Sequence, residues 1–183
     1  LESVTIPQTV TEIGDSVFSG CSGLTAVNIN TNLTKAGVDV FAGCDALSTV
    51  RISGFGANSL WSLQLFSGCT SISSVSVGNG AIGVGASTFS NCTGLTSLLL
   101  TGGVTSVGES AFSGCTALSS VRTPTSLSNV GRNAFSGTAW YDAQPDGLVY
   151  VGNVAYRYKG AVPSNTTVTL REDTTGISDY AFS

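Results

Sequence analysis

Short segments with alternating apolar and polar residues recur along the chain. In Ala26-Val-Asn-Ile29 every second side chain is a β-branched apolar one, and equivalent segments follow the same pattern. Such alternation is typical of a β-strand that buries one face. We therefore expect Val27 and Ile29 to point inward, and Ala26 and Asn28 to point outward. The segments span residues 1–6, 24–29, 47–52, 72–77, 95–100 and 118–123.

A phenylalanine within a short turn-like phrase marks the same point in every repeat. Phe112-Ser-Gly-Cys-Thr-Ala-Leu118 is one copy, and the phenylalanines from Phe18 to Phe135 are separated by 23, 25, 23, 23 and 23 residues. A constant period of roughly 20 to 50 residues indicates stacked repeats. Because a unit of this length cannot bury its apolar side chains alone, we expect equivalent residues to form continuous internal columns and equivalent strands to pair in parallel.

A second, shorter apolar pair follows each strand. Val104 with Val107 is one example, and a glycine such as Gly108 usually comes next. The residues between that glycine and the phenylalanine are too few for an independent helix. We expect a short helical or 3-10 turn in this place.

The repeated phrase L-x-x-V-x-I-P-x-x-V-x-x-I-G-x-x-x-F-x-G-C resembles the BspA-like leucine-rich repeats of bacterial and some protist surface proteins. Residues 1–137 and 165–183 match it. The resemblance implies a right-handed leucine-rich repeat solenoid that is β-rich, with one parallel strand per coil and short helical or 3-10 turns. It also implies an extracellular or cell-surface location and a role in protein binding or cell adhesion.

The repeat divides the chain into three parts. We expect a leucine-rich repeat array of six coils over residues 1–137, a β-hairpin insertion over 138–164 and a partial further repeat over 165–183. The parts are expected to form a single continuous domain. Since the chain opens on a repeat and stops within one, we expect it to be a fragment of a longer protein whose export signal or anchor lies elsewhere.

The insertion contains a hairpin signal and most of the tyrosines. Leu148–Val151 and Val154–Tyr158 flank Gly152-Asn153, a dipeptide suited to a two-residue hairpin turn. The aromatic side chains can either cover the end of the array, which we favour, or form a platform for a glycan or protein partner. The residues of this candidate aromatic surface are Trp140, Tyr141, Tyr150, Tyr156 and Tyr158.

The third unit is two residues longer than its neighbours. The extra length falls within Gly54–Trp61, and insertions in a solenoid usually form a loop on one face. Counting back from Phe66 places Trp61 in an internal apolar column, so we expect it in the core and favour this over an exposed, ligand-stacking position. Phe55 is less constrained, and an exposed position is open to it.

The composition argues against nucleic acid and membrane insertion. The chain has a net charge of −4 with only seven Lys and Arg residues, whereas phosphate binding needs a clustered basic surface. No apolar run approaches the ~20 residues of a spanning helix. We therefore expect no nucleic-acid partner and no direct membrane insertion of this segment.

The cysteines recur three residues after the phenylalanines. Equivalent positions on stacked coils lie about one strand spacing apart, ~4.8 Å, with parallel side chains, which is poor geometry for a disulfide. We predict a column of reduced, buried thiols. Metal-ligand spacing and histidine are absent, so we expect no metal and no cofactor. The cysteines are Cys21, Cys44, Cys69, Cys92 and Cys115.

The composition also argues against a catalytic function. Without histidine the commonest general base is missing, and the acidic residues are scattered through loops. We expect a protein that is not an enzyme, and a polysaccharide-active enzyme domain is the least favoured alternative.

The outward positions of the strands are the remaining candidate for function. One outward row is Thr5, Asn28, Arg51, Ser76, Leu99 and Arg122, with Thr169 after the gap, and a neighbouring row is Ser3, Ala26, Thr49, Ser74, Ser97 and Ser120. Arg51 and Arg122 are the best candidates for contacts, because arginine is enriched at interface hot spots and binds carboxylates with a fork of donors. They can equally serve solubility.

We predict a non-catalytic cell-surface or secreted module that binds a protein or glycan ligand through Asn28, Arg51, Ser76, Leu99 and Arg122. The alternatives are a structural spacer within a larger surface protein and a glycan-binding module. We expect a monomer, with end-to-end association of the fragment as a further possibility because its strand edges are open.

Overall fold

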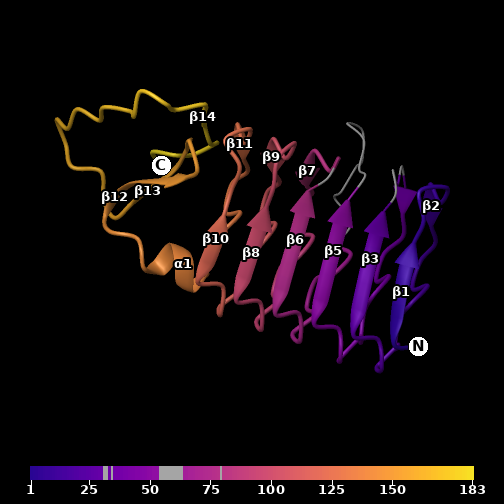
Figure 1. The fold of residues 1–183 in the computed structure, drawn as a ribbon. Helices are drawn as coiled ribbons and strands as arrows, with labels where there is room; N and C mark the ends of the chain where they lie inside the picture. The colour runs from indigo at the N-terminus through magenta and orange to yellow at the C-terminus, as the bar shows by residue number, and fades with distance from the viewer. Residues whose placement is uncertain (31–32, 34, 54–63, 79) are drawn as a thin grey trace.

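The chain forms a solenoid of stacked coils, as the repeat predicts (Figure 1). The computed structural model describes residues 1–30, 33, 35–53, 64–78 and 80–183. The predicted fold class, a leucine-rich repeat solenoid with parallel strands and a hairpin insertion, is confirmed. Trp61 and Phe55 lie outside the described residues.

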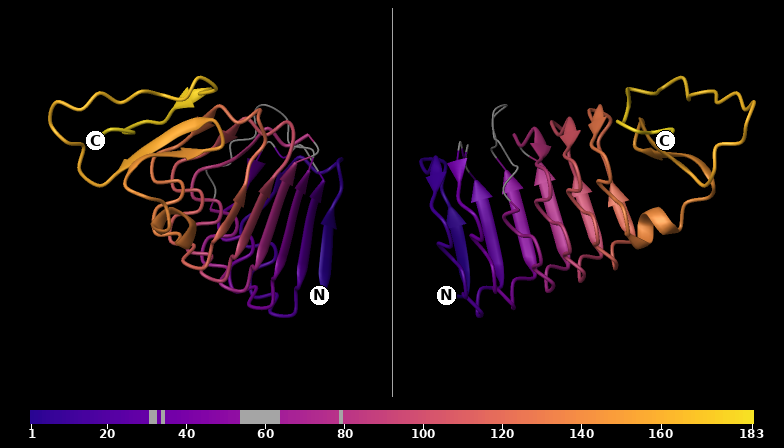
Figure 2. Two further views of the ribbon diagram at one scale, coloured as in Figure 1. Left: turned by 60° about the vertical axis from the view of Figure 1, so that its left-hand side comes forward. Right: turned by 180° about the vertical axis from the view of Figure 1, so that it is seen from behind.

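One strand of each coil contributes to a parallel sheet along one flank of the solenoid (Figure 2). Equivalent residues pair throughout, so Val27 lies opposite Val50 and Val50 opposite Val75. The predicted direction of the side chains is confirmed, because Val27 and Ile29 are fully buried. The described strands, in their order across this sheet, are β1 (Ser3–Ile6), β3 (Ala26–Asn30), β5 (Thr49–Ser53), β6 (Ser74–Gly78), β8 (Ser97–Leu100) and β10 (Ser120–Arg122).

The second residue of the shorter apolar pair, such as Val107, lies in a further short strand, which the sequence analysis did not predict. β7, β9 and β11 form one parallel sheet, and β2 pairs with β4. A strand of two residues is too short to display the alternation from which strands are recognised. Their bounds are β2 (Glu12–Ile13), β4 (Lys35–Ala36), β7 (Gly83–Val84), β9 (Ser106–Val107) and β11 (Asn129–Val130).

The phenylalanines form a single internal column between these strands. Neighbouring rings are stacked, with centroids 4.8 to 5.5 Å apart. Five of them, from Phe41 to Phe135, are fully buried, and Phe18 at the first coil is partly buried. The predicted column is therefore confirmed, and it joins the coils into one hydrophobic core.

The segments before the phenylalanines form turns in the described coils, and the expected helical or 3-10 turns are absent there. The residue two positions before each phenylalanine has a left-handed backbone, with φ of 53° at Ser16 and 54° at Ser110. A left-handed residue interrupts any right-handed helical run. The residues in this position are Ser16, Asp39, Gln64, Ser87, Ser110, Asn133 and Tyr180.

The array ends in a short helix, a hairpin and one further short strand. After α1 (Ala139–Asp142) the chain forms the predicted hairpin of β12 (Gly147–Val151) and β13 (Val154–Lys159). The last strand, β14 (Gly176–Ile177), pairs in parallel with β13, and both pack against β11. Val168–Leu170 forms no strand, so the expectation that Thr169 continues the outward row is wrong. The hairpin redirects the chain away from β10, as Figure 1 shows.

Candidate functional site

The strand register brings the predicted contact residues into one row. Asn28 lies opposite Arg51, Arg51 opposite Ser76, and Ser76 opposite Leu99. Leu99 lies opposite Arg122, and Thr5 extends the row at the other end beside Asn28. We call the outward side of the sheet of β1, β3, β5, β6, β8 and β10 the strand face, and these six residues its outward row.

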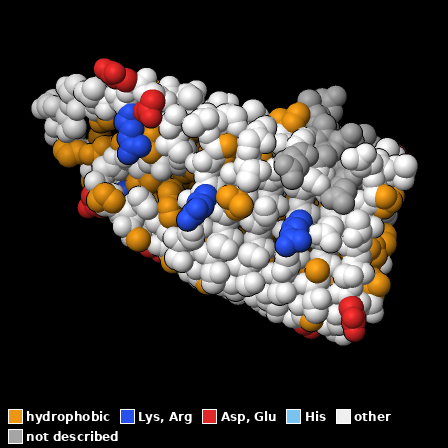
Figure 3. Space-filling model, in the orientation of Figure 1, with side chains coloured by type: hydrophobic (Ala, Val, Ile, Leu, Met, Phe, Trp, Pro, Cys, Tyr) orange, Lys and Arg blue, Asp and Glu red, His pale blue; other side chains and the backbone are white. Residues whose placement is uncertain are grey.

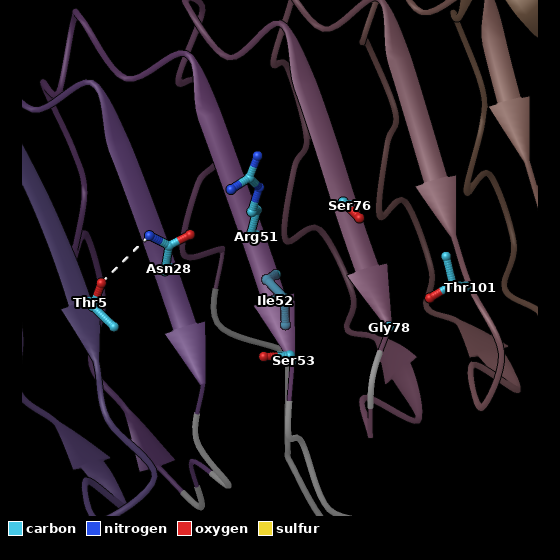
Figure 4. A pocket seen from close by; sticks show the side chains of 8 residues that line it. All are labelled: Thr5, Asn28, Arg51, Ile52, Ser53, Ser76, Gly78 and Thr101. Carbon is cyan, nitrogen blue, oxygen red and sulfur yellow. Dashed lines mark hydrogen bonds between the residues drawn. The ribbon is translucent and has the colours of Figure 1, made fainter.

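Part of the strand face is hollowed into a shallow depression of about 450 Å³. Ser76 and Gly78 on β6 contribute to its lining, and a Cβ atom at Gly78 would meet the Thr101 hydroxyl, so the Thr101 side chain occupies the space beside this glycine. Arg51 stands on the adjacent strand β5, and Figure 4 shows its side chain between Asn28 and Ser76. The lining residues are Thr5, Asn28, Arg51, Ile52, Ser53, Ser76, Gly78 and Thr101.

The polar groups of the depression are mostly donors or hydroxyl groups. Arg51 is exposed, and within the described part of the chain its guanidinium has no hydrogen bond or ion pair. The Asn28 amide donates to the Thr5 hydroxyl over 3.5 Å, a long hydrogen bond that a ligand can replace. The depression is thus suited to a ligand that offers acceptor oxygens.

The charge on the strand face has one sign. Arg51 and Arg122 are two of the seven basic residues, and none of the eleven acidic residues lies in the described strands of this sheet. Figure 3 shows two isolated basic patches over the strands, surrounded by uncharged surface. The strand face is therefore locally cationic in a chain whose net charge is −4.

Leu99 and Arg122 lie outside the depression but in the same outward row. Leu99 is 42% exposed, although the other leucines of β8 are buried. Arg122 is exposed on the neighbouring strand β10. The row therefore continues from the depression onto a flat area with one apolar and one basic side chain.

A column of hydroxyl groups holds the strand starts in register. The Thr25 hydroxyl donates to the Glu2 carbonyl over 2.9 Å, and the Thr96 hydroxyl donates to the Ser73 carbonyl over 3.0 Å. Ser48 and Ser73 continue the same column. Each bond joins neighbouring coils, so the outward row is presented by a fixed scaffold.

Three aromatic residues of the insertion cover the end of the phenylalanine column. The Trp140 ring centroid lies 5.4 Å from that of Phe135, and Tyr156 approaches Phe135 edge-on at 6.0 Å. Tyr141 packs edge-on against Tyr156. Tyr156 is only 2% exposed, and its hydroxyl accepts a hydrogen bond from the Phe135 backbone N–H. This placement favours the structural interpretation of the insertion over an exposed platform.

The other two tyrosines of the candidate aromatic surface lie apart from this group. The Tyr150 hydroxyl accepts from the Arg171 backbone N–H, and the Arg171 guanidinium lies 4.0 Å from the Tyr150 ring centroid. Tyr158 lies against Phe182, with ring centroids 6.5 Å apart. Tyr150 and Tyr158 therefore hold the C-terminal segment, and the five aromatic residues are not joined into one surface.

The cysteines form the predicted column of free thiols. The Cys92 thiol donates to the Phe66 carbonyl and the Cys115 thiol to the Phe89 carbonyl, both over 3.0 Å. Burial raises the pKa of Cys69 to about 12, and it also raises the pKa of Cys44. No group of three or more potential metal ligands occurs in the part of the chain that the structure describes.

The sequence analysis missed the residues that shape the depression. Ser53, Gly78 and Thr101 come two positions after the outward row, where the same alternation places the next outward side chains. The strand pattern could have identified them. Glycine at position 78 permits the close approach of Thr101, because a Cβ atom there would clash with the Thr101 hydroxyl.

Comparisons with known proteins agree with this architecture. A family model of the BspA type leucine-rich repeat region matches residues 1–63 and 62–159, with six copies. The structure is similar to that of a leucine-rich cell surface protein from Faecalibacterium prausnitzii A2-165, with 25% sequence identity and a TM-score of 0.55. That similarity covers 100% of this chain and 45% of the other, so the chain spans less than half of that protein.

Two further solved structures share 22% and 25% sequence identity with the chain. One is a T. pallidum leucine-rich repeat protein, with a TM-score of 0.47 and coverage of 75% of this chain and 76% of the other. The second is a leucine-rich repeat protein from Bacteroides ovatus ATCC 8483, with a TM-score of 0.46 and coverage of 76% and 47%. No curated protein matches the sequence. None of the helices in the described residues is long and apolar enough to cross a bilayer.

Proposed function

Because the chain belongs to the BspA-type leucine-rich repeat family, we propose that it is a non-catalytic binding module of a cell-surface or secreted protein. It binds a protein partner through the strand face, in an adhesion-type interaction. The observation that carries this proposal is the depression around Arg51, whose guanidinium has no hydrogen bond or ion pair among the described residues and lies beside donor and hydroxyl groups. The surface location is supported by similarity to a leucine-rich cell surface protein.

A protein partner fits the strand face better than a neutral glycan. No aromatic side chain occurs in the described strands of the sheet, so the face offers no ring on which a sugar could stack. Arginine is instead enriched at protein interfaces, and the exposed Leu99 adds apolar area beside it. The depression is shallow, so affinity comes from several modest contacts along the row.

The alternative is a structural spacer within a larger surface protein. The hydroxyl column and the stacked phenylalanines favour it, because they give a stiff rod whatever the outward residues are. A spacer has no need of an accessible binding face. The two functions therefore differ in whether the strand face is used.

Selection of ligands on the purified chain tests the proposal. A random peptide display library is selected on the immobilised chain, and the enriched peptides are measured against Ser76→Trp, which fills the depression. Thr116→Trp, at an exposed turn outside the strand face, is the matched control. We expect the first variant to weaken binding about tenfold or more, a loss of ~1.4 kcal/mol, and the second to leave it unchanged.

The alternative predicts a different outcome of the same selection. Failure to enrich any peptide, or binding that Ser76→Trp does not weaken, would favour the spacer. Both variants must keep the thermal unfolding midpoint of the unmodified chain, so that a loss of binding is not a loss of fold.

The proposed location has its own test. In the source cell the full-length protein should be cleaved by protease added to intact cells, or be recovered from the medium. Protection until the cells are lysed would contradict a surface or secreted protein.

A further inference from the structure

We propose that the ligand of the strand face is an extended acidic peptide segment that lies across the strands, with two carboxylates four residues apart. One carboxylate binds Arg51 and the other binds Arg122. This inference rests on the proposed function and specifies the partner's chemistry. It follows from the charge, the spacing and the apolar contact along the outward row.

The charge of the row selects an anionic ligand. Neither Arg51 nor Arg122 has a hydrogen bond or ion pair within the described residues, and the strands of the sheet contain no acidic residue. An arginine presents a fork of donors that matches a carboxylate in a bidentate geometry. The ligand therefore meets two donor forks without having to displace an internal acidic partner.

The spacing of the arginines sets the spacing of the carboxylates. Arg51 on β5 and Arg122 on β10 are separated by two intervening strands, β6 and β8. Three strand spacings of ~4.8 Å place their Cα atoms about 14 Å apart. An extended peptide rises ~3.4 Å per residue, so residues i and i+4 lie about 14 Å apart with their side chains on the same side.

The residues between the arginines define the middle of the ligand. Residue i+2 of the peptide faces the same way as the two carboxylates and lies above Ser76 and Leu99. Leu99 is 42% exposed and gives this side chain an apolar contact. The peptide therefore carries an apolar residue at i+2, as in Asp-Ser-Val-Ser-Asp.

A polyanionic polysaccharide is less compatible with the same surface. It carries charge along its whole length, whereas this face offers two separated guanidinium groups. The chain as a whole has a net charge of −4 and therefore repels a long polyanion. A short segment with two acidic side chains satisfies both arginines and leaves no charge unpaired.

Synthetic peptides measured by fluorescence anisotropy test the proposal. The probe is a labelled peptide Gly-Asp-Ser-Val-Ser-Asp-Gly, and its controls replace both Asp with Asn or place the two Asp two residues apart. We expect the probe to bind more tightly than either control. Binding should weaken as salt rises from 50 to 500 mM, conditions chosen because exposed charge pairs are screened by ions.

Protein variants locate the contact. Arg51→Gln and Arg122→Gln should each weaken binding of the probe about fivefold, as for an exposed ion pair worth ~1 kcal/mol. The matched control is Lys35→Gln. It removes the same charge as each single arginine variant, but from an exposed residue outside the strand face. It should leave binding unchanged.

Three outcomes would overturn the inference. In the first, the protein binds the Asp probe and its Asn control with equal affinity. In the second, the arginine substitutions do not change binding of the probe. In the third, heparin competes for the same arginines with higher affinity than the probe. If the display selection yields strand-face ligands without acidic pairs, the inference fails while the proposed function stands. If no peptide depends on the strand face in either experiment, both fail.

Discussion

Two kinds of glycine recur in the coils, and they are required for different reasons. The glycine in the Phe-Ser-Gly-Cys phrase has a left-handed backbone, with φ of 72° at Gly20 and 74° at Gly114. In the fourth unit Asn91 takes this place with φ of 59°, and asparagine is one of the few other residues that tolerates it. The glycine before the phenylalanine turn, such as Gly108, is instead required by the close approach of two coils.

Substitution of Gly108 by alanine should destabilise the array strongly. A Cβ atom at Gly108 would lie 2.5 Å from the Ala86 backbone nitrogen, so neighbouring coils would have to separate. We expect a loss of about 1 to 3 kcal/mol in the free energy of unfolding, measured by urea denaturation. Gly102→Ala is the control, because a Cβ there meets nothing within 4 Å. Equal effects of the two substitutions would contradict the role assigned to Gly108.

Alkaline pH should destabilise the fold through buried groups that resist ionisation. Burial raises the pKa of Cys69 from 9.0 to about 12 and that of Tyr156 from 10.0 to about 12. Between these values the unfolded chain has released protons that the folded chain retains. The stability that these two protonated groups contribute to the fold is therefore complete below about pH 9 and is lost as pH rises toward 12.

The measurement is the free energy of unfolding at several pH values from 7.5 to 11, a range chosen to cross the unfolded-state pKa values. Each group contributes a slope of at most ~1.4 kcal/mol per pH unit. The double variant Cys69→Ala with Tyr156→Phe should show a shallower fall. An unchanged slope in this variant would rule out these two groups as the cause.

The short helix α1, which follows the last coil, is held by hydrogen bonds at both its N-terminus and its C-terminus. Thr138 takes the place of the repeated cysteine, and its hydroxyl accepts from the Tyr141 backbone N–H as an N-cap. It also donates to the Phe135 carbonyl over 2.8 Å. At the other end the Lys159 ammonium donates to the carbonyls of Asp142 and Gln144, which ties the helix to β13. The departure from the repeat therefore has a structural reason.

Removal of the Thr138 hydroxyl should loosen this element. Thr138→Val keeps the shape of the side chain but leaves the helix start without its cap, and we expect a loss of about 1 kcal/mol. Thr138→Ser retains the hydroxyl and serves as the control. Urea denaturation followed by tryptophan fluorescence, to which Trp140 beside this cap contributes, measures the loss, and a valine variant as stable as the serine variant would contradict the capping role.

The sequence predicted the elements whose side chains repeat with a clear period. Alternation placed Val27 and Ile29 inside, and the phenylalanine interval predicted the internal column and the outward row with Arg51. The two-residue strands and the left-handed turns were missed, because neither contains enough residues to show a period. Pairing of β14 with β13 could not be predicted, since it depends on how the hairpin packs against β11.

At the scale of the whole molecule, stability is a sum over neighbouring coils. Phe89 is fully buried between two stacked rings, at centroid distances of 5.1 and 5.5 Å. Phe18 in the first coil is partly buried and stacks on Phe41. Equivalent residues therefore differ in their contribution according to their position along the array.

Truncation of these two phenylalanines should show the difference. Phe89→Ala should cost about 3 to 5 kcal/mol, because it opens a cavity with neighbours on both sides. Phe18→Ala should cost roughly half as much or less, since part of its surface is already in contact with solvent. Equal losses of unfolding free energy in the two variants, measured by chemical denaturation, would contradict the description of stability as a sum over neighbouring coils.

The fixed register of the sheet makes the solenoid a molecular ruler. Equivalent outward residues on neighbouring coils lie one strand spacing apart. The distance between two outward side chains that bind a ligand is therefore a whole number of strand spacings. An exchange such as Arg51→Ser with Ser76→Arg would shorten the interval between the cationic groups by ~4.8 Å while every inward column stays the same. Ligand preference in such an array can therefore drift, or be engineered, in discrete steps that are independent of folding.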